Sequence, residues 1–176
     1  MEAEVVVFHA ATTACARGRS WPAALCVLQG QQRMGLGLTA IACSAAISAC
    51  EEDGQWEWAV WLLAALRVPN AVACSAAVSA CEKGRQWRRS VQILAGMFAA
   101  QLEPNVITCN AVLRACQQER QHSAARGLLQ AMQSGGPGPD VLSLSAAIGV
   151  CTVCGRLRPL PALLMEVQQC ASLAKK

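Results

Sequence analysis

The chain has 176 residues, of which 54% are hydrophobic, and its formal net charge is +4. Such a length normally forms one domain, and the apolar content is ample for a continuous core. No apolar run approaches the roughly 18 residues that a membrane-spanning helix needs, so we expect no membrane insertion. The start, Met1-Glu2-Ala3-Glu4, is acidic where a secretory or organelle-import segment would be basic. The small positive charge permits a polyanionic partner but does not require one.

One short phrase recurs along the whole chain. It starts at Val5, Ala40, Ala71, Val106 and Val141, at spacings of 35, 31, 35 and 35 residues. These starts divide a single array into the units 5–39, 40–70, 71–105, 106–140 and 141–175. A fixed period of this size indicates stacked repeats, in which each unit buries its apolar face against its neighbours. Functional side chains are therefore expected at equivalent positions of successive units, and not in one catalytic cluster.

The first half of each unit has the apolar spacing of an amphipathic helix. Positions 4, 7, 8 and 11 are apolar or small, and in the fourth unit they are Cys109, Val112, Leu113 and Cys116. This spacing predicts a single buried helix face. A polar turn follows, for example at residues 51–55 and 82–86, where we expect glycine to end the helix in the left-handed conformation.

A second helix is predicted to start at position 17 of each unit, which is Trp21, Trp56 and Trp87 in the first three. We interpret these tryptophans as packing residues and not as platforms for base stacking. The second unit is four residues short, and the loss falls late in its second helix. Because four residues are about one helical turn, that helix should be shorter but keep its apolar face.

The cysteines are explained by the repeat. Five of the eleven occupy position 11 of their units, namely Cys15, Cys50, Cys81, Cys116 and Cys151. Equivalent positions of packed helices lie about 10 Å apart, which is too far for a disulfide. We therefore interpret them as small buried side chains in a reducing compartment. The lone C-x-x-C at residues 151–154 has no second pair or nearby histidine, so neither a metal site nor a cofactor is predicted.

A helix–turn–helix unit of 35 residues that begins V-[IV]-x-[CY]-[NS] and ends Pro-[ND] resembles the pentatricopeptide repeat family. The resemblance extends over about residues 5–175. It implies an all-α fold, an α-solenoid of ten helices in five hairpins forming a right-handed superhelix. It also implies binding of single-stranded RNA, one base per repeat. Most members act in plastid or mitochondrial RNA processing, stability or translation. A mitochondrial or plastid location is thus implied by the resemblance alone, and no catalytic motif points to an enzyme.

The resemblance further implies which positions contact a base. The aliphatic residues at position 2 sandwich it, and they are Val6, Ile41, Val72, Ile107 and Leu142. Position 5 and the last residue of the unit contact the base edge. These pairs are His9 with Thr39, Ser44 with Asn70, Ser75 with Asn105, Asn110 with Asp140, and Ser145 with Lys175. In the family, Ser with Asn resembles an adenine reader and Asn with Asp a uracil reader. The second to fourth units would then read 5′-AAU-3′, and the outer two pairs match no familiar combination.

Helix geometry supports the assignment of positions 2 and 5 to one binding surface. Simpler interpretations of the same residues stay open. Positions 2 and 5 are neighbours on one helix face, largely separate from the core stripe. The last residues Thr39, Asn70, Asn105 and Asp140 are also residue types that cap helix N-termini, and both roles can hold together. The alternative function is a protein-binding helical scaffold. The chain could also be a piece of a longer array, with a protein partner or self-association through ends that lack polar capping helices.

Overall fold

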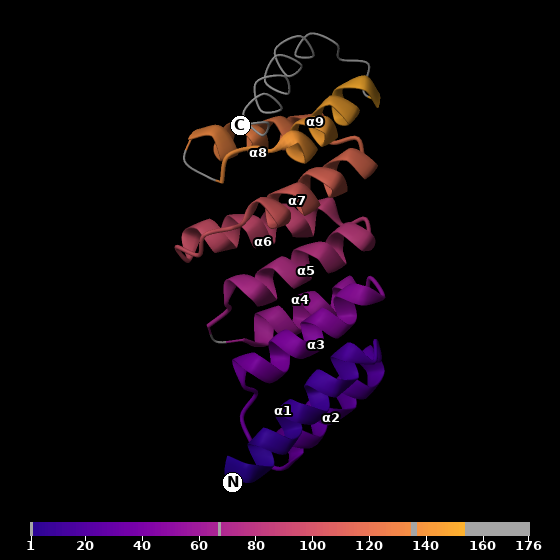
Figure 1. Ribbon diagram of the computed structural model, residues 1–176, viewed down its shortest axis with the longest axis vertical. Helices are drawn as coiled ribbons and strands as arrows, with labels where there is room; N and C mark the ends of the chain where they lie inside the picture. The colour runs from indigo at the N-terminus through magenta and orange to yellow at the C-terminus, as the bar shows by residue number, and fades with distance from the viewer. Residues whose placement is uncertain (1, 67, 135–136, 154–176) are drawn as a thin grey trace, which may run out of the picture. The chain divides into compact units, whose positions relative to one another are not determined.

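All regular structure in the described part of the chain is helical. The computed structural model describes residues 2–66, 68–134 and 137–153. Their helices are α1 (Glu2–Arg17), α2 (Trp21–Arg33), α3 (Ala40–Glu52), α4 (Trp56–Ala65), α5 (Ala71–Lys83), α6 (Trp87–Ala99), α7 (Val106–Gln118), α8 (His122–Ser134) and α9 (Val141–Val153) (Figure 1). None of these helices is long and apolar enough to cross a bilayer. The predicted tenth helix lies outside the described residues.

The helix starts follow the repeat. Helices α3, α5, α7 and α9 begin at position 1 of their units, and α2, α4, α6 and α8 begin at position 17. Helix α4 has 10 residues, whereas α2, α6 and α8 have 13 each. The four-residue deletion therefore shortens the second helix of its unit, as the sequence predicts.

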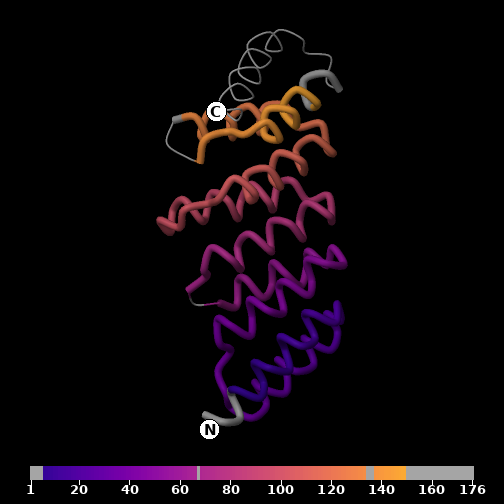
Figure 2. The backbone as a smooth tube through the Cα atoms, viewed as in Figure 1, coloured from indigo at the N-terminus to yellow at the C-terminus, as the bar shows by residue number. Residues whose placement is uncertain are grey.

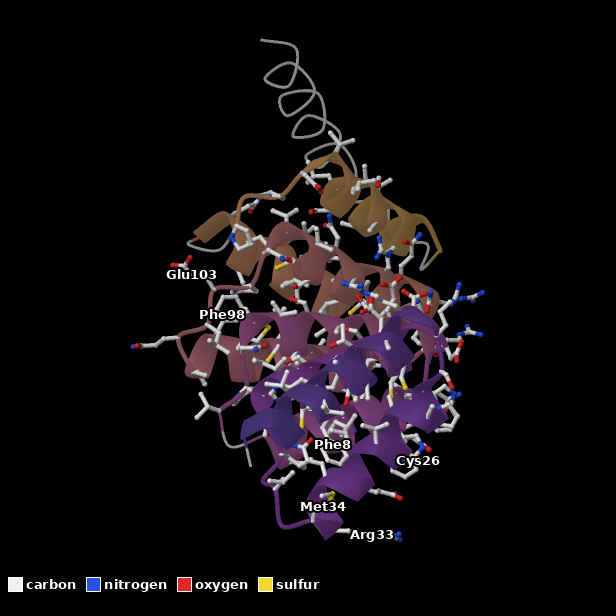
Figure 3. All side chains as sticks on the ribbon, turned by 60° about the horizontal axis from the view of Figure 1, so that its bottom comes forward. Phe8, Cys26, Arg33, Met34, Phe98 and Glu103 are labelled. Atoms are coloured by element: carbon white, nitrogen blue, oxygen red, sulfur yellow. The ribbon has the colours of Figure 1, made fainter. Side chains whose placement is uncertain are left out.

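The helices form two compact units, residues 1–86 and 87–176, each a stack of helical hairpins (Figure 2). In the first unit α3 packs between α1 and α5, while α2 contacts α1 and α3, and α4 contacts α3 and α5. Phe8 of α1 lies against Gly30 of α2, and its side chain is labelled in Figure 3. In the second unit α7 packs against α6, α8 and α9, and α8 also contacts α9.

The core is built from the predicted stripe. In α3, α5 and α7 every residue at positions 4, 7, 8 and 11 is buried, and three of the largest are Ile47, Val78 and Leu113, each fully buried. The cysteines between Cys15 and Cys116 are all free thiols. Burial raises the pKa of Cys109 and Cys116 to about 11, so both remain neutral at physiological pH. These thiols therefore pack as small apolar groups, in contrast to the exposed Cys26 labelled in Figure 3.

The turn between the two helices of a repeat departs from the prediction at one glycine. Gly54 has the expected left-handed conformation, with φ 65°, but Gly84 has φ −79° and Arg85 has φ 58°. Both left-handed residues stand at position 15, so the turn geometry selects the position whatever residue fills it. Gly84 is needed for another reason: a Cβ there would lie 2.3 Å from Trp56 Cδ1. This close approach confirms that Trp56 is a packing residue.

Candidate nucleic-acid interface

The aliphatic residues at position 2 form a set of exposed apolar side chains. Their exposed fractions lie between 61% and 70%, and the residues are Val6, Ile41, Val72, Ile107 and Leu142. Each stands at or near the start of a first helix, and in α3, α5, α7 and α9 the next residue is already buried. Exposed aliphatic side chains contribute little to folding, and a set of them at one repeat position indicates a surface that contacts a ligand.

The last residues of the repeats cap the helices that follow. Thr39 Oγ1, Asn70 Oδ1, Asn105 Oδ1 and Asp140 Oδ1 each accept a hydrogen bond from the backbone N–H three residues ahead, at 2.7–3.3 Å. Thr39, Asn70 and Asn105 have the extended backbone that an N-cap requires. The capping interpretation is therefore confirmed. Because a capped oxygen keeps a second lone pair and an amide keeps its N–H groups, capping does not remove the ability to bind a base.

In the compact unit formed by residues 1–86, position 5 of a repeat contacts the last residue of the same repeat. His9 Nε2 and Thr39 Oγ1 are hydrogen-bonded to each other. Asn70 Nδ2 donates to Ser44 Oγ over 3.5 Å, while the Ser44 hydroxyl donates to the backbone oxygen of Ala40. Asn70 is exposed and Ser44 is half-buried. The Ser44–Asn70 pair is thus open to a ligand and held by one long hydrogen bond.

In the compact unit formed by residues 87–176, the corresponding pair is held by more hydrogen bonds. Asn110 Nδ2 lies 3.2 Å from both carboxylate oxygens of Asp140, and Asn110 is only 5% exposed. Burial raises the pKa of the Asp140 carboxyl, but hydrogen bonds from Ser143, Asn110 and the Leu142 backbone outweigh it, so this pKa lies below its ordinary 3.8. Asp140 is therefore an anionic acceptor at neutral pH, beside the buried amide of Asn110.

For the other two predicted pairs, the two members are not both described within one compact unit. Ser75 belongs to the first unit and Asn105 to the second. Ser145 is exposed, and its hydroxyl donates to the backbone oxygen of Leu142 at 2.9 Å. Its predicted partner, Lys175, lies outside the described residues.

The structure adds two polar residues that the sequence pattern does not single out. Thr108 and Ser143, at position 3 of their repeats, are buried, and their hydroxyls contact the capping residues Asn105 and Asp140 at 2.8 Å. A hydroxyl three residues after an N-cap is the local signal that could reveal them, because such residues bond reciprocally with the cap. The described residues contain no group of three or more His, Cys, Asp or Glu placed to hold a metal ion. The C-x-x-C pair is completed by Cys154, which lies outside them.

Stacks of helical hairpins with a recurring geometry at each repeat define the chain as an α-helical repeat protein. Residues 92–153 match the pentatricopeptide repeat domain family. This match agrees with the resemblance that the sequence shows, and the fold of the described residues is all-α.

Solved pentatricopeptide repeat structures have the same fold. The domain of Arabidopsis thaliana protein-only RNase P 1 (PRORP1), crystallised in complex with tRNA, superposes with a TM-score of 0.76 at 13% identity, covering 90% of this chain and 86% of that chain. PPR10 from maize gives a TM-score of 0.76 at 18% identity, covering 97% of this chain and 25% of that one. PPR10 in complex with an 18-nt psaJ RNA element gives 0.74 at 21% identity, with 90% and 24% coverage. This chain thus spans about a quarter of PPR10. No curated protein matches the sequence significantly.

Proposed function

We propose that the chain binds single-stranded RNA with base selectivity and without catalysis. The observation that carries the proposal is the repeated juxtaposition of an exposed aliphatic residue at position 2 with a polar pair at position 5 and the repeat end. Two of the similar structures, PPR10 and the PRORP1 domain, were solved in complex with RNA. At their low identity the likeness concerns the fold alone, so the support for binding comes from the side chains of this chain.

The exposed aliphatic residues would bind the faces of the bases. A base that inserts between the side chains of consecutive repeats, such as Val6 and Ile41, removes apolar surface from water on both sides. Burial of this kind stabilises the complex by about 25 cal/mol per Å² of apolar surface. The contact is independent of base identity, since every base has two apolar faces. Selectivity must therefore come from the polar pair.

The polar pairs differ in the hydrogen-bonding groups that they offer. Asp140 is a carboxylate and can only accept, which suits the ring N–H of uracil and repels the unprotonated ring nitrogen of cytosine. Asn70 offers both an amide N–H and an oxygen, which suits the acceptor and donor edge of adenine. We infer that the second to fourth repeats read 5′-AAU-3′ through the pairs Ser44/Asn70, Ser75/Asn105 and Asn110/Asp140.

We also infer from the family resemblance that the chain acts in RNA processing, stability or translation in a mitochondrion or plastid. Imaging of a fluorescent fusion of the full-length protein tests the location. Signal in either organelle supports it, and a signal confined to the rest of the cell overturns it.

A protein-binding scaffold is a second candidate function, and one observation favours it. Trp58 and Trp61 on α4 are 38% and 52% exposed and pack edge to face, with ring centroids 6.0 Å apart. Tryptophan is enriched at protein interfaces, so this exposed pair is a candidate contact for a protein partner or for self-association.

A binding titration with short labelled RNAs separates these functions. The probes carry a central AAU, CCC or GGG, and each is measured at two salt concentrations. We expect tighter binding to AAU, and an affinity that falls as salt rises because phosphate contacts release counterions. The double variant Trp58→Ser/Trp61→Ser should bind RNA like the wild type. Equal affinity for all three probes, or none for any, would overturn base-selective binding, and the second outcome would favour the scaffold.

A further inference from the structure

Three pairs are joined within a compact unit, and two of them, Asn110/Asp140 and Ser44/Asn70, differ in what holds them. Ser143 is the third residue of α9 and is fully buried. Its hydroxyl lies within hydrogen-bonding distance of Asn110 Oδ1, is 2.8 Å from Asp140 Oδ1, and accepts from the Asp140 backbone N–H at 3.2 Å. One side chain thus contacts both members of the Asn110/Asp140 pair.

These contacts determine which way the Asn110 amide faces. A carboxylate can only accept hydrogen bonds, so the Asn110 NH₂ group must face Asp140. The Ser143 hydroxyl then donates to the amide oxygen on the other side. A flipped amide would place its oxygen against the carboxylate, where neither group could donate. Ser143 and Asp140 together therefore leave the amide a single favourable orientation.

The Ser44/Asn70 pair has no such support. The residue equivalent to Ser143 is Ala73, which has no hydrogen-bonding side chain. The Asn70 amide reaches Ser44 over 3.5 Å, against the 3.2 Å between Asn110 and Asp140. Position 3 is also alanine at Ala42, but it is a hydroxyl residue at Thr108, which donates to Asn105 Oδ1 at 2.8 Å. A hydroxyl at position 3 is thus present three residues after Asn105 and Asp140. It is absent at the same distance from Thr39 and Asn70.

We propose that the hydroxyl at position 3 of a repeat is a positioning residue that orients the base-reading pair of the preceding repeat. Ser143 makes Asn110/Asp140 a rigid reader that discriminates strongly between uracil and cytosine, while Ala73 leaves Ser44/Asn70 adaptable and less selective. This inference rests on the proposed RNA-binding function. Its physical basis is preorganisation, since a pair already held in its binding geometry loses less conformational freedom when the base arrives.

The first test compares Ser143→Ala with the wild type on RNAs that carry U or C at the third position of AAU. We expect discrimination between the two RNAs to fall about fivefold, which corresponds to one lost hydrogen bond. Ser143→Thr keeps the hydroxyl and should restore discrimination. Ser123→Ala removes an exposed serine from α8 and serves as the matched control. Undiminished discrimination in Ser143→Ala would overturn the proposal.

A second readout needs no RNA. Without the Ser143 hydroxyl on its oxygen, the Asn110 amide is no longer held with its NH₂ group toward Asp140. Because that NH₂ group lowers the pKa of the Asp140 carboxyl, this pKa, followed by NMR titration, should rise toward the ordinary value in Ser143→Ala. An unchanged pKa would overturn the positioning role even if RNA binds. If the wild type shows no base selectivity but the pKa rises, the proposed function fails while the positioning of the pair stands.

If Ser143→Ala does not fold, the proposal can still be tested by adding a hydroxyl at position 3 of another repeat. Ala73→Ser adds a hydroxyl where α5 lacks one, beside the capping residue Asn70. We expect it to increase selectivity for adenine at the first position of AAU. Unchanged or weaker selectivity in a folded Ala73→Ser protein would contradict the role of position 3.

Discussion

At the scale of single residues, the last residue of each repeat has a structural role as well as a proposed functional one. Asn70, Asn105 and Asp140 cap helices, and replacing such a cap by alanine typically costs about 1 kcal/mol. A loss of RNA affinity after such a substitution would therefore combine two effects. The exposed aliphatic residues are better probes, because their side chains make little contribution to stability.

Ile107→Ala should separate binding from folding. Ile107 is 70% exposed, so its truncation should change the free energy of unfolding by less than about 0.5 kcal/mol. If the side chain covers a base, RNA affinity should fall about fivefold, since roughly 1 kcal/mol of apolar burial is lost. Thermal unfolding and an RNA titration measure the two quantities.

The control for this change is Val68→Ala. Val68 is 77% exposed but stands in the segment between α4 and α5, at the end of a repeat and not at position 2. It should alter neither stability nor affinity. Equal losses of affinity in the two variants would mean that the position 2 residues have no special contact with the base.

At the scale of helices and turns, close packing determines where glycine is needed. Gly84 has an ordinary φ of −79°, so alanine could adopt its backbone, but the new Cβ would meet the Trp56 ring. Gly96 lies in α6 and is exposed, and a Cβ added there would have no neighbouring atom within 4 Å. The two glycines thus offer opposite environments for the same substitution.

Gly84→Ala should destabilise the protein by about 1–3 kcal/mol, because overpacking forces Trp56 out of its place. Gly96→Ala should stabilise it by about 0.5–1 kcal/mol, since alanine is the better helix former. Chemical denaturation of both variants measures the changes. A destabilising effect of similar size at both positions would show that the Trp56 contact has no energetic importance.

Most elements of the fold are predictable from the repeat, and the exceptions have physical reasons. The 3.6-residue period of apolar residues locates the first helices, and the 31-residue spacing predicts the short α4. The expectation of a left-handed glycine is wrong at Gly84, since the turn geometry selects position 15, where Arg85 stands. The role of Ser143 is not predictable in this way, because its contact with Asn110 spans 33 residues and depends on how α7 and α9 pack.

At the scale of the whole molecule, base reading is distributed over successive repeats. A base held by stacking contributes roughly 1–3 kcal/mol, so three selective repeats give modest affinity on their own. The chain spans about 25% of the length of PPR10, which has the same fold. The net charge of +4 adds attraction to phosphate that salt weakens, whereas selectivity between bases of equal charge should persist. Salt dependence and base selectivity are therefore separate properties of the array.

The most direct measurement exchanges one reading pair for another. The double variant Asn110→Ser/Asp140→Asn gives the fourth repeat the same pair as Ser44/Asn70, and its affinity is measured for RNAs that carry A, C, G or U at the third position. We expect the preferred base to change from U to A at that position, while the preference at the first position stays unchanged. A folded double variant that still prefers U would contradict the assignment of base reading to these side chains.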